Sequence, residues 1–364
     1  MLIKNINVIF GFAKTGLYNY FCISSMIHNK ENPLFPSSDI PKDVLIFDDM
    51  LRGLRNHFVE IGFDICPKGF TYEELSFTDD SSKIIDFINK YYGNKDWKVT
   101  ITTAEIQAFI DRGNTCAVGL LWNKLLIGLV IVEVYDVFYK GTIQKAGCGD
   151  YLTLHPKFRN KGIATSLVAK AMDKVGEMGA QWTFFHSHSK LHVDCPFTHT
   201  IYNLSLTDMP KIVGISNKAA CKLRPLVTKL IEPKIEHVKL LNEQSYSIYI
   251  KYDDNMLHSM LKHDIVYTDG NNVLRFVSLC NVQKGITIKT ATLIDYTKPN
   301  NIQLFNSALN DLREKGFDLV TIINDKTLND IISTFPFEKN SEMYMYTGNI
   351  LPKAKINEIH LNLR

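Results

Sequence analysis

Hydrophobic residues recur at intervals of three and four from residue 160 to residue 178, which is the clearest helical pattern in the chain. Gly179 follows directly, and glycine commonly ends a helix because it adopts the left-handed conformation at no steric cost. The apolar stripe comprises Ile163, Ala164, Leu167, Val168, Ala171, Met172 and Val175. The same spacing predicts helices over 48–58, 81–91, 103–110, 301–315 and 328–334.

Alternating apolar and polar positions predict strands in both halves of the chain. Polar breaks between several of these segments are typical of hairpin turns. The predicted strands cover 71–77, 115–122, 125–135, 146–154 and 181–186, then 265–268, 273–282, 289–296, 319–323 and 342–346, with turns at 122–124, 140–141 and 269–272.

Strands followed by a helix, a strand, a helix and a strand occur in both halves, which predicts an α/β (α+β) protein made of two related units. We expect an N-terminal arm over 1–66, a first domain over 67–220 and a second over 221–364. The segment 187–216 is rich in turn-forming and polar residues, and a connection of that length is often functional.

The composition is that of a globular protein. The chain has 364 residues, of which 45% are hydrophobic, so it can bury a sizeable core. A net charge of +3 is too small to predict nucleic-acid binding. The seven cysteines form no C-x-x-C pair, which argues against a disulfide framework or a structural zinc site. No stretch approaches the ~18 apolar residues of a membrane span, and we expect a cytoplasmic protein.

The segment most suggestive of chemistry links the strand that ends at Leu154 to the long helix. It carries Lys157, Arg159 and Lys161, and Gly162 stands at the start of the helix. The first N–H groups of a helix have no intrahelical partner and the helix dipole is positive there, so this loop is a candidate pyrophosphate cradle. Neither a P-loop nor a dinucleotide-binding fingerprint is present. An ordinary exposed loop with basic residues is the alternative.

The R-x-x-G-x-A pattern from Arg159 to Ala164 resembles the coenzyme-A-binding loop of the GNAT acyltransferases. More of the chain resembles the N-myristoyltransferase family: KGFTYEEL at 68–75 is similar to the family's QGFTWDALDL, and KGFDL at 315–319 to its KGFDVF. The segments 151–161 and 198–206 match two further blocks in the same order. The resemblance runs from about Leu34 to Arg364, and it implies two tandem GNAT-like domains with mixed sheets in one compact, saddle-like unit.

The resemblance implies the transfer of a myristoyl group from myristoyl-CoA to the N-terminal glycine amine of other proteins. The amine would attack the thioester directly, so neither a protein nucleophile nor a metal nor a permanently bound cofactor is expected. The main-chain N–H groups of Tyr151 and Leu152 would hold the oxyanion. The main-chain carboxylate of Arg364 would act as the base, because an α-amine with a pKa of about 7.7–8.0 needs only a weak one.

The resemblance also implies two sets of binding residues. The acyl-CoA set is Leu34, Phe35, Tyr151, Leu152, Thr153, Leu154, Arg159, Asn160, Lys161, Gly162, Ile163 and Ala164. The peptide set is Asp150, Ser187 and Asn203, in which Asp150 and Asn203 replace an Asn and a His of the family. The first domain would bind acyl-CoA and the second the peptide, in a monomer.

Two alternative functions stay open at this point: another GNAT N-acetyltransferase, or a catalytically weak relative that binds acyl-CoA or a peptide. His186, His188 and His192 lie close together and are a candidate metal site. No complete zinc-binding spacing surrounds them, so we interpret them as polar residues near the peptide groove.

Overall fold

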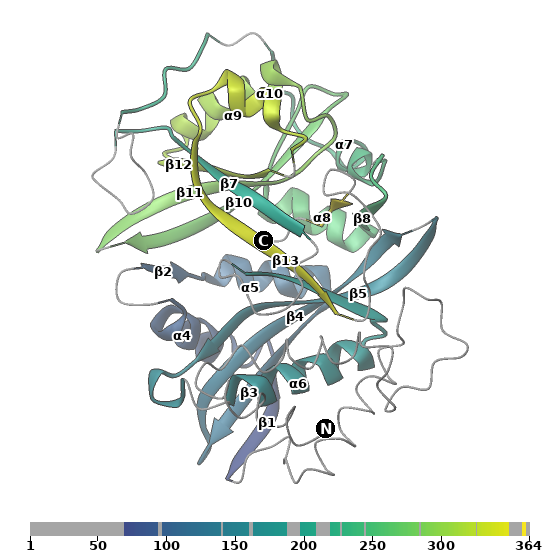
Figure 1. Ribbon diagram of the computed structural model, residues 1–364, viewed down its shortest axis with the longest axis vertical. Coiled ribbons are helices and arrows are strands. Elements are labelled where there is room, and N and C mark those ends of the chain that lie inside the picture. The colour runs from purple at the N-terminus through teal and green to yellow at the C-terminus, as the bar shows by residue number, and fades with distance from the viewer. Residues whose placement is uncertain are drawn as a thin grey trace, which may run out of the picture.

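Figure 1 shows the computed structural model of the chain. It describes residues 69–93, 97–139, 141–159, 163–187, 197–208, 219–225, 228–243, 245–283, 285–324, 326–348 and 359–361. The predicted arm over 1–66 and the predicted helix over 48–58 lie outside these residues.

The first half follows the predicted order of strands and helices closely. Its elements are β1 (Phe70–Leu75), α4 (Ser81–Tyr91), β2 (Trp97–Thr100), α5 (Thr103–Arg112), β3 (Thr115–Trp122), β4 (Leu125–Tyr139), β5 (Thr142–Leu154), the 3-10 helix η1 (Pro156–Phe158), α6 (Ile163–Glu177), β6 (Trp182–Ser187) and β7 (Phe197–Ser205). The predicted hairpin at 122–124 is confirmed, because Asn123 and Lys124 both have positive φ, as a tight hairpin turn requires.

The second half contains every predicted element and several that the sequence pattern did not indicate. Its elements are α7 (Ile235–Lys239), the 3-10 helix η2 (Leu240–Asn242), β8 (Ile248–Lys251), α8 (Asp254–His263), β9 (Ile265–Thr268), β10 (Val273–Gln283), β11 (Ile286–Tyr296), α9 (Ile302–Glu314), β12 (Leu319–Asn324), α10 (Asn329–Thr334), β13 (Glu338–Gly348) and β14 (Ile359–His360).

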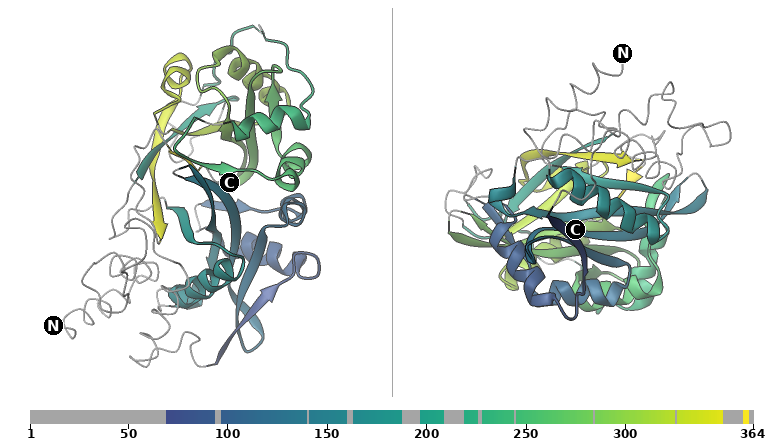
Figure 2. Two further views of the ribbon diagram at one scale, coloured as in Figure 1. Left: turned by 90° about the vertical axis from the view of Figure 1, so that its right-hand side faces the viewer. Right: turned by 90° about the horizontal axis from the view of Figure 1, so that it is seen from below.

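The strands in the described part of the chain join one mixed sheet. Its order is β1-β3-β4-β5-β6-β13-β7-β12-β11-β10-β2, with β8 beside β4, β9 beside β10 and β14 beside β8. The two halves interdigitate, because β13 of the second half lies between β6 and β7, and β2 of the first half pairs with β10. Figure 2 shows the blue first-half and green to yellow second-half elements stacked along the long axis.

Helices cover both faces of the sheet in the first half. Val130 and Val132 of β4 pack under α6, whereas the alternate residues Leu129 and Ile131 pack under α4 and α5. This is the period-two alternation expected of a strand buried on both faces. In the second half, α9 and α10 pack over the strands β10, β11 and β12 (Figure 1). Within the described residues, no helix is both long and apolar enough to cross a membrane.

The segment predicted to be turn-rich, 187–216, contains the strand β7. Its inward positions include His199, Asn203 and Ser205, all of them buried. Polar residues on the buried face weaken the hydrophobic alternation from which strands are identified, which is why the sequence pattern missed β7.

Candidate active site

The parallel strands β5 and β6 pair side by side and then separate. They pair only between Ala146–Cys148 and Trp182–Phe184. β5 continues to Leu154, whereas the last residues of β6 pair with β13. In the described part of these strands no further pairing joins them, so their carboxyl ends diverge. The main-chain groups of β5 beyond Cys148 therefore face the space between two parallel strands.

A β-bulge lies in β5 just beyond this divergence. Leu129 of β4 is opposite Thr153 and Ile131 is opposite Asp150, so two residues of β5, Tyr151 and Leu152, stand against one of β4. Tyr151 has a φ of 50°, a conformation that costs a non-glycine residue about 1–2 kcal/mol. The bulge sits where the sequence predicted the oxyanion-binding N–H groups.

Packing holds Tyr151 in this conformation. Its side chain is only 4% exposed, and its ring lies 5.4 Å from Tyr92 and 6.3 Å from Phe109, measured between centroids. The Thr153 hydroxyl donates a hydrogen bond to the Tyr151 carbonyl at 2.8 Å, and the Tyr151 N–H donates to Asp150 Oδ1 at 2.7 Å. Burial, together with the negative charge of Asp150, raises the pKa of Tyr92.

Arg159 fastens the loop after β5 to the end of α4. Its guanidinium donates to three main-chain carbonyl oxygens: Leu154 at 2.9 Å, Gly93 at 3.3 Å and Tyr91. Three of its five N–H groups are used in this way. The positive charge also lies at the carboxyl end of α4, where the helix dipole favours a cation. Arg159 therefore shapes the loop in which the sequence placed it as a coenzyme ligand.

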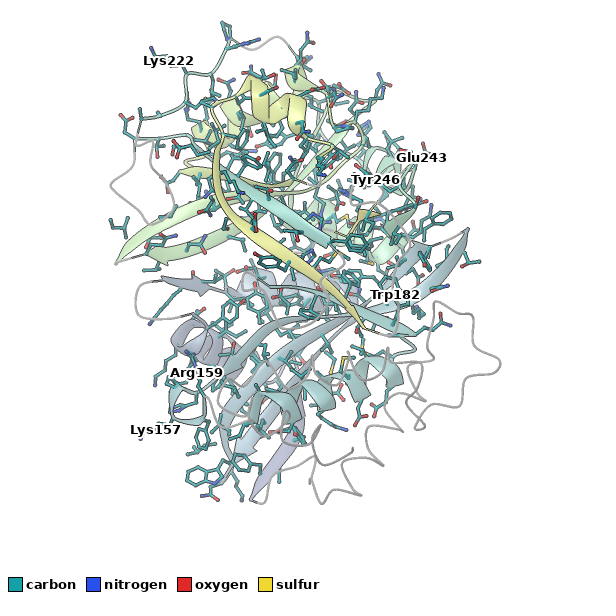
Figure 3. The ribbon with its side chains drawn as sticks, viewed as in Figure 1. Lys157, Arg159, Trp182, Lys222, Glu243 and Tyr246 are labelled. Atoms are coloured by element: carbon teal, nitrogen blue, oxygen red, sulfur yellow. The ribbon has the colours of Figure 1, made fainter. Side chains whose placement is uncertain are left out.

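The electrostatic field at this loop is positive. Partial burial and the nearby cations Lys157, Lys90 and Arg159 lower the pKa of His155. Lys157 is exposed, and Figure 3 shows it beside Arg159 at the lower edge of the first half. A phosphate-bearing ligand would meet an attractive potential here.

The helix that follows the loop presents its backbone, since its first side chains are buried. Ile163 and Ala164 are 8% and 4% exposed and pack against β4 and β5. Any contact of these two predicted coenzyme ligands with a phosphate would therefore use their main-chain N–H groups. α6 also lies very close to β5, because a Cβ placed on Gly147 would come within 2.8 Å of Val175 Cβ.

The second half repeats the bulge but not the basic loop. Ile294 of β11 is an extra residue opposite β10, in the position that corresponds to the bulge in β5. The helix after it, α9, is capped by its own chain, since Asn301 Oδ1 accepts a hydrogen bond from the Leu304 N–H at 3.1 Å. The connecting segment 297–300 contains Lys298 as its one cation. The candidate phosphate cradle thus belongs to the first half alone.

The predicted peptide-binding residues occupy two places. Ser187 pairs with Tyr344 of β13, across from the diverging end of β5 that carries Asp150. Asn203 pairs with Glu338, at the other end of the same strand, and its Oδ1 accepts a hydrogen bond from the Thr321 hydroxyl at 2.8 Å. Six residues of extended chain separate the two positions along β13, which is roughly 20 Å.

The described carboxyl-terminal segment runs inside the fold. β14 pairs parallel with β8, and Ile359, His360 and Leu361 are all at most 3% exposed. His360 Nε2 lies 2.9 Å from Asp295 Oδ1, and Arg275 Nη1 donates to the other oxygen of Asp295. These three residues are therefore part of the buried core.

Other predicted residues are not brought into a site or lie outside the described ones. The rings of His186 and His199 lie 5.7 Å apart, on strands that flank β13. Among the residues that the structure describes, no group of three metal-ligating side chains occurs. The predicted residues outside the description are Leu34, Phe35, Asn160, Lys161, Gly162, His188, His192 and Arg364.

Sequence reasoning missed three features of this region. Tyr92 packs against Tyr151, His199 faces His186, and Arg275 joins the buried cluster at Asp295. Each contact joins segments from different elements, and no local spacing signals it.

The family model for the Acetyltransferase (GNAT) family matches residues 82–192, which include β5, its bulge and α6. No curated protein matches the chain. A crystal structure of Saccharomyces cerevisiae N-myristoyltransferase with bound myristoyl-CoA is similar at a TM-score of 0.65 and 12% identity, covering 78% of this chain and 83% of that one. A second structure of the yeast enzyme gives 0.66 and 11%, covering 82% and 86%.

A putative acetyltransferase from Pyrococcus horikoshii is also similar, with a TM-score of 0.51 and 10% identity over 79% of this chain and 93% of that one. At these identities the similarity is one of fold. The chain has a tandem GNAT fold of the N-myristoyltransferase kind, and the predicted fold class is confirmed.

Proposed function

We propose that this protein is an acyl-CoA-dependent N-acyltransferase that transfers a myristoyl group from myristoyl-CoA to the N-terminal glycine amine of other proteins. One observation carries the proposal: β5 separates from β6 at a bulge, immediately before a positively charged loop and a helix. A thioester between the strands would point its carbonyl oxygen at the bulge while its pyrophosphate reached the loop. The tandem GNAT fold supports the acyltransferase class.

In this mechanism the protein binds, orients and stabilises, and supplies no nucleophile. The main-chain N–H groups of Tyr151 and Leu152 would stabilise the oxyanion that forms when the amine attacks, usually the largest single contribution to such catalysis. The carboxylate at Arg364 would accept a proton from the ammonium. Peptide binding by Asp150, Ser187 and Asn203 belongs to the same proposal.

The long acyl chain follows from the resemblance and has a testable energetic consequence. Each CH₂ group buried from water contributes roughly 0.8 kcal/mol, so a chain of about 14 carbons that is fully enclosed would bind far more tightly than an acetyl group. A site that does not enclose the chain would show no such preference.

The test is an acyl-transfer assay with the purified full-length protein. A glycyl peptide is incubated with myristoyl-CoA or acetyl-CoA, and its mass is measured. The expected product carries one tetradecanoyl group on the amine, and the same peptide with a blocked N-terminus stays unmodified. A gain of an acetyl group only would identify an N-acetyltransferase, and acyl-CoA binding without any product would identify a binding protein.

A further inference from the structure

The Asp150 side chain occupies a donor that the proposed reaction needs. Asp150 Oδ1 accepts the hydrogen bond of the Tyr151 N–H at 2.7 Å, within the bulge. The proposed function assigns this N–H to the oxyanion of the thioester. This N–H belongs to the peptide group that joins Asp150 to Tyr151, so the acceptor is the side chain of the residue directly before it.

A carboxylate and a thioester carbonyl compete unequally for one N–H group. The hydrogen bond to the carboxylate is assisted by a full negative charge and is about twice as strong as a bond between neutral groups. The thioester carbonyl is neutral until it is attacked. Acyl-CoA alone therefore does not displace the Asp150 side chain, and the donor stays covered in the complex with acyl-CoA.

The negative charge of Asp150 acts on the groups around it. Burial and the negative charge of Asp150 raise the pKa values of two neighbours, the Cys148 thiol and the Tyr92 hydroxyl. Both groups are therefore neutral near pH 7. An arriving ammonium would meet the carboxylate at short range, where the attraction between opposite charges is largest.

We propose that Asp150 is a gate on the oxyanion hole, and that the N-terminal ammonium of the acceptor opens it. The ammonium attracts the carboxylate away from the Tyr151 N–H, which uncovers the donor only when the acceptor is in place. This inference rests on the proposed function and adds to it the coupling between acceptor binding and catalysis. Its chemical requirement is an acceptor that carries a positive charge on the attacking amine.

The step balances in atoms and charge. The ammonium gives one proton to the base, which in the proposed mechanism is the Arg364 carboxylate, and the neutral amine forms a C–N bond with the thioester carbon. The electron pair of the C=O bond moves to oxygen, and the uncovered Tyr151 N–H donates a hydrogen bond to this oxyanion. Collapse of this intermediate breaks the C–S bond, and a second proton passes from nitrogen to the sulfur of coenzyme A. The products are the amide and free coenzyme A.

A gate of this kind protects acyl-CoA from water. Water carries no net charge and attracts the carboxylate less strongly than an ammonium does, so the donor stays covered and hydrolysis is slow without an acceptor. An oxyanion-hole donor contributes on the order of 10²–10³ in rate. Uncovering the Tyr151 N–H should therefore raise acceptor-independent hydrolysis by up to roughly 10²–10³-fold.

The experiment compares two variants in two assays. Asp150→Ala removes the cover, and Asp150→Asn keeps an oxygen on the N–H but loses the charge. Release of coenzyme A from myristoyl-CoA is measured without peptide, and transfer is measured with a glycyl peptide. Asp136→Ala is the matched control, because Asp136 lies on the neighbouring strand in an exposed ion pair with Lys145.

The expected pattern is specific to a gate. Asp150→Ala hydrolyses faster than the wild type and transfers more slowly, Asp150→Asn transfers more slowly with a smaller rise in hydrolysis than Asp150→Ala, and Asp136→Ala is unchanged in both assays. Hydrolysis by Asp150→Ala at or below the wild-type rate overturns the proposal. If circular dichroism shows that Asp150→Ala is unfolded, Asp150→Asn decides alone, and transfer at the wild-type rate overturns the gate. A wild-type protein that transfers no acyl group refutes the proposed function itself.

Discussion

Replacing Arg159 by alanine should destabilise the protein, although the sequence places this arginine as a coenzyme ligand. Its guanidinium donates to the carbonyl oxygens of Leu154, Gly93 and Tyr91, which lie on two segments, the end of β5 and the end of α4. A typical intramolecular hydrogen bond contributes about 0.5–1.5 kcal/mol net, and the bond to Gly93 is long at 3.3 Å. We therefore expect Arg159→Ala to lower the free energy of unfolding by about 2–3 kcal/mol.

The matched comparison is Lys157→Ala, which removes the same charge from the same loop. Lys157 is exposed, and substitutions at such positions usually change stability by less than about 0.5 kcal/mol. Arg159→Lys keeps the positive charge but cannot make the same three hydrogen bonds. Its free energy of unfolding should therefore lie between those of Arg159→Ala and Lys157→Ala.

The assay is urea denaturation followed by circular dichroism, together with the Kd for acyl-CoA. Both alanine variants should weaken acyl-CoA binding, because both reduce the positive potential of the loop. Only Arg159→Ala should lower the urea midpoint. Free energies of unfolding for the two alanine variants that agree within about 0.5 kcal/mol would refute the structural role of Arg159.

Three further predictions concern the framework of the site. In Gly147→Ala the new Cβ would lie 2.8 Å from Val175 Cβ and would push α6 away from the sheet. We expect this variant to lose about 1–3 kcal/mol of unfolding free energy, measured by urea denaturation, and to bind acyl-CoA more weakly. Arg112→Leu should lower the free energy of unfolding by about 3–5 kcal/mol, because it leaves the buried Glu133 carboxylate, 2.7 Å from Arg112, without its cation. Adding Glu133→Gln should restore most of this free energy. Burial alone would raise the pKa of Asp295, but its hydrogen-bonding and cationic partners outweigh burial and lower it from 3.8 to about 2. The lowered pKa stabilises the folded protein by about 2 kcal/mol above about pH 5, and this stabilisation is lost as the pH falls through 4 toward 2. The urea midpoint of the wild type should therefore fall over that pH window. The midpoint of an Asp295→Asn variant should fall less.

The local elements of the fold were predictable because their signals are local. The hairpin turn at Asn123 and the apolar stripe of α6 each lie within one short segment of the chain, and each is confirmed. The strands β3, β4 and β5 were found because their buried positions are mostly apolar, whereas β2 was not indicated by the pattern.

The arrangement of these elements depends on contacts that no local pattern contains. The insertion of β13 between β6 and β7 joins residues more than a hundred positions apart. β7 was missed because His199 and Asn203 occupy its buried face. The sequence pattern also did not indicate β8 and α8.

The candidate site was predictable in position but not in detail. The motif from Arg159 to Ala164 indicated the loop, and the resemblance implied oxyanion donors at Tyr151 and Leu152, where the structure has a bulge. No local pattern indicated that the Arg159 guanidinium would hydrogen-bond within the fold, or that the Asp150 side chain would accept the hydrogen bond of the next N–H. Both are consequences of backbone conformation, which side-chain identity alone does not determine.

The position of β13 also sets an order of events during synthesis. β6 and β7 emerge from the ribosome long before β13 does, and until it arrives each of them has an edge with unpaired main-chain groups. A polypeptide released near residue 220 would keep those two edges permanently, and exposed edges of this kind pair with other chains. The nascent first half should therefore depend on chaperones until the last tenth of the chain is made.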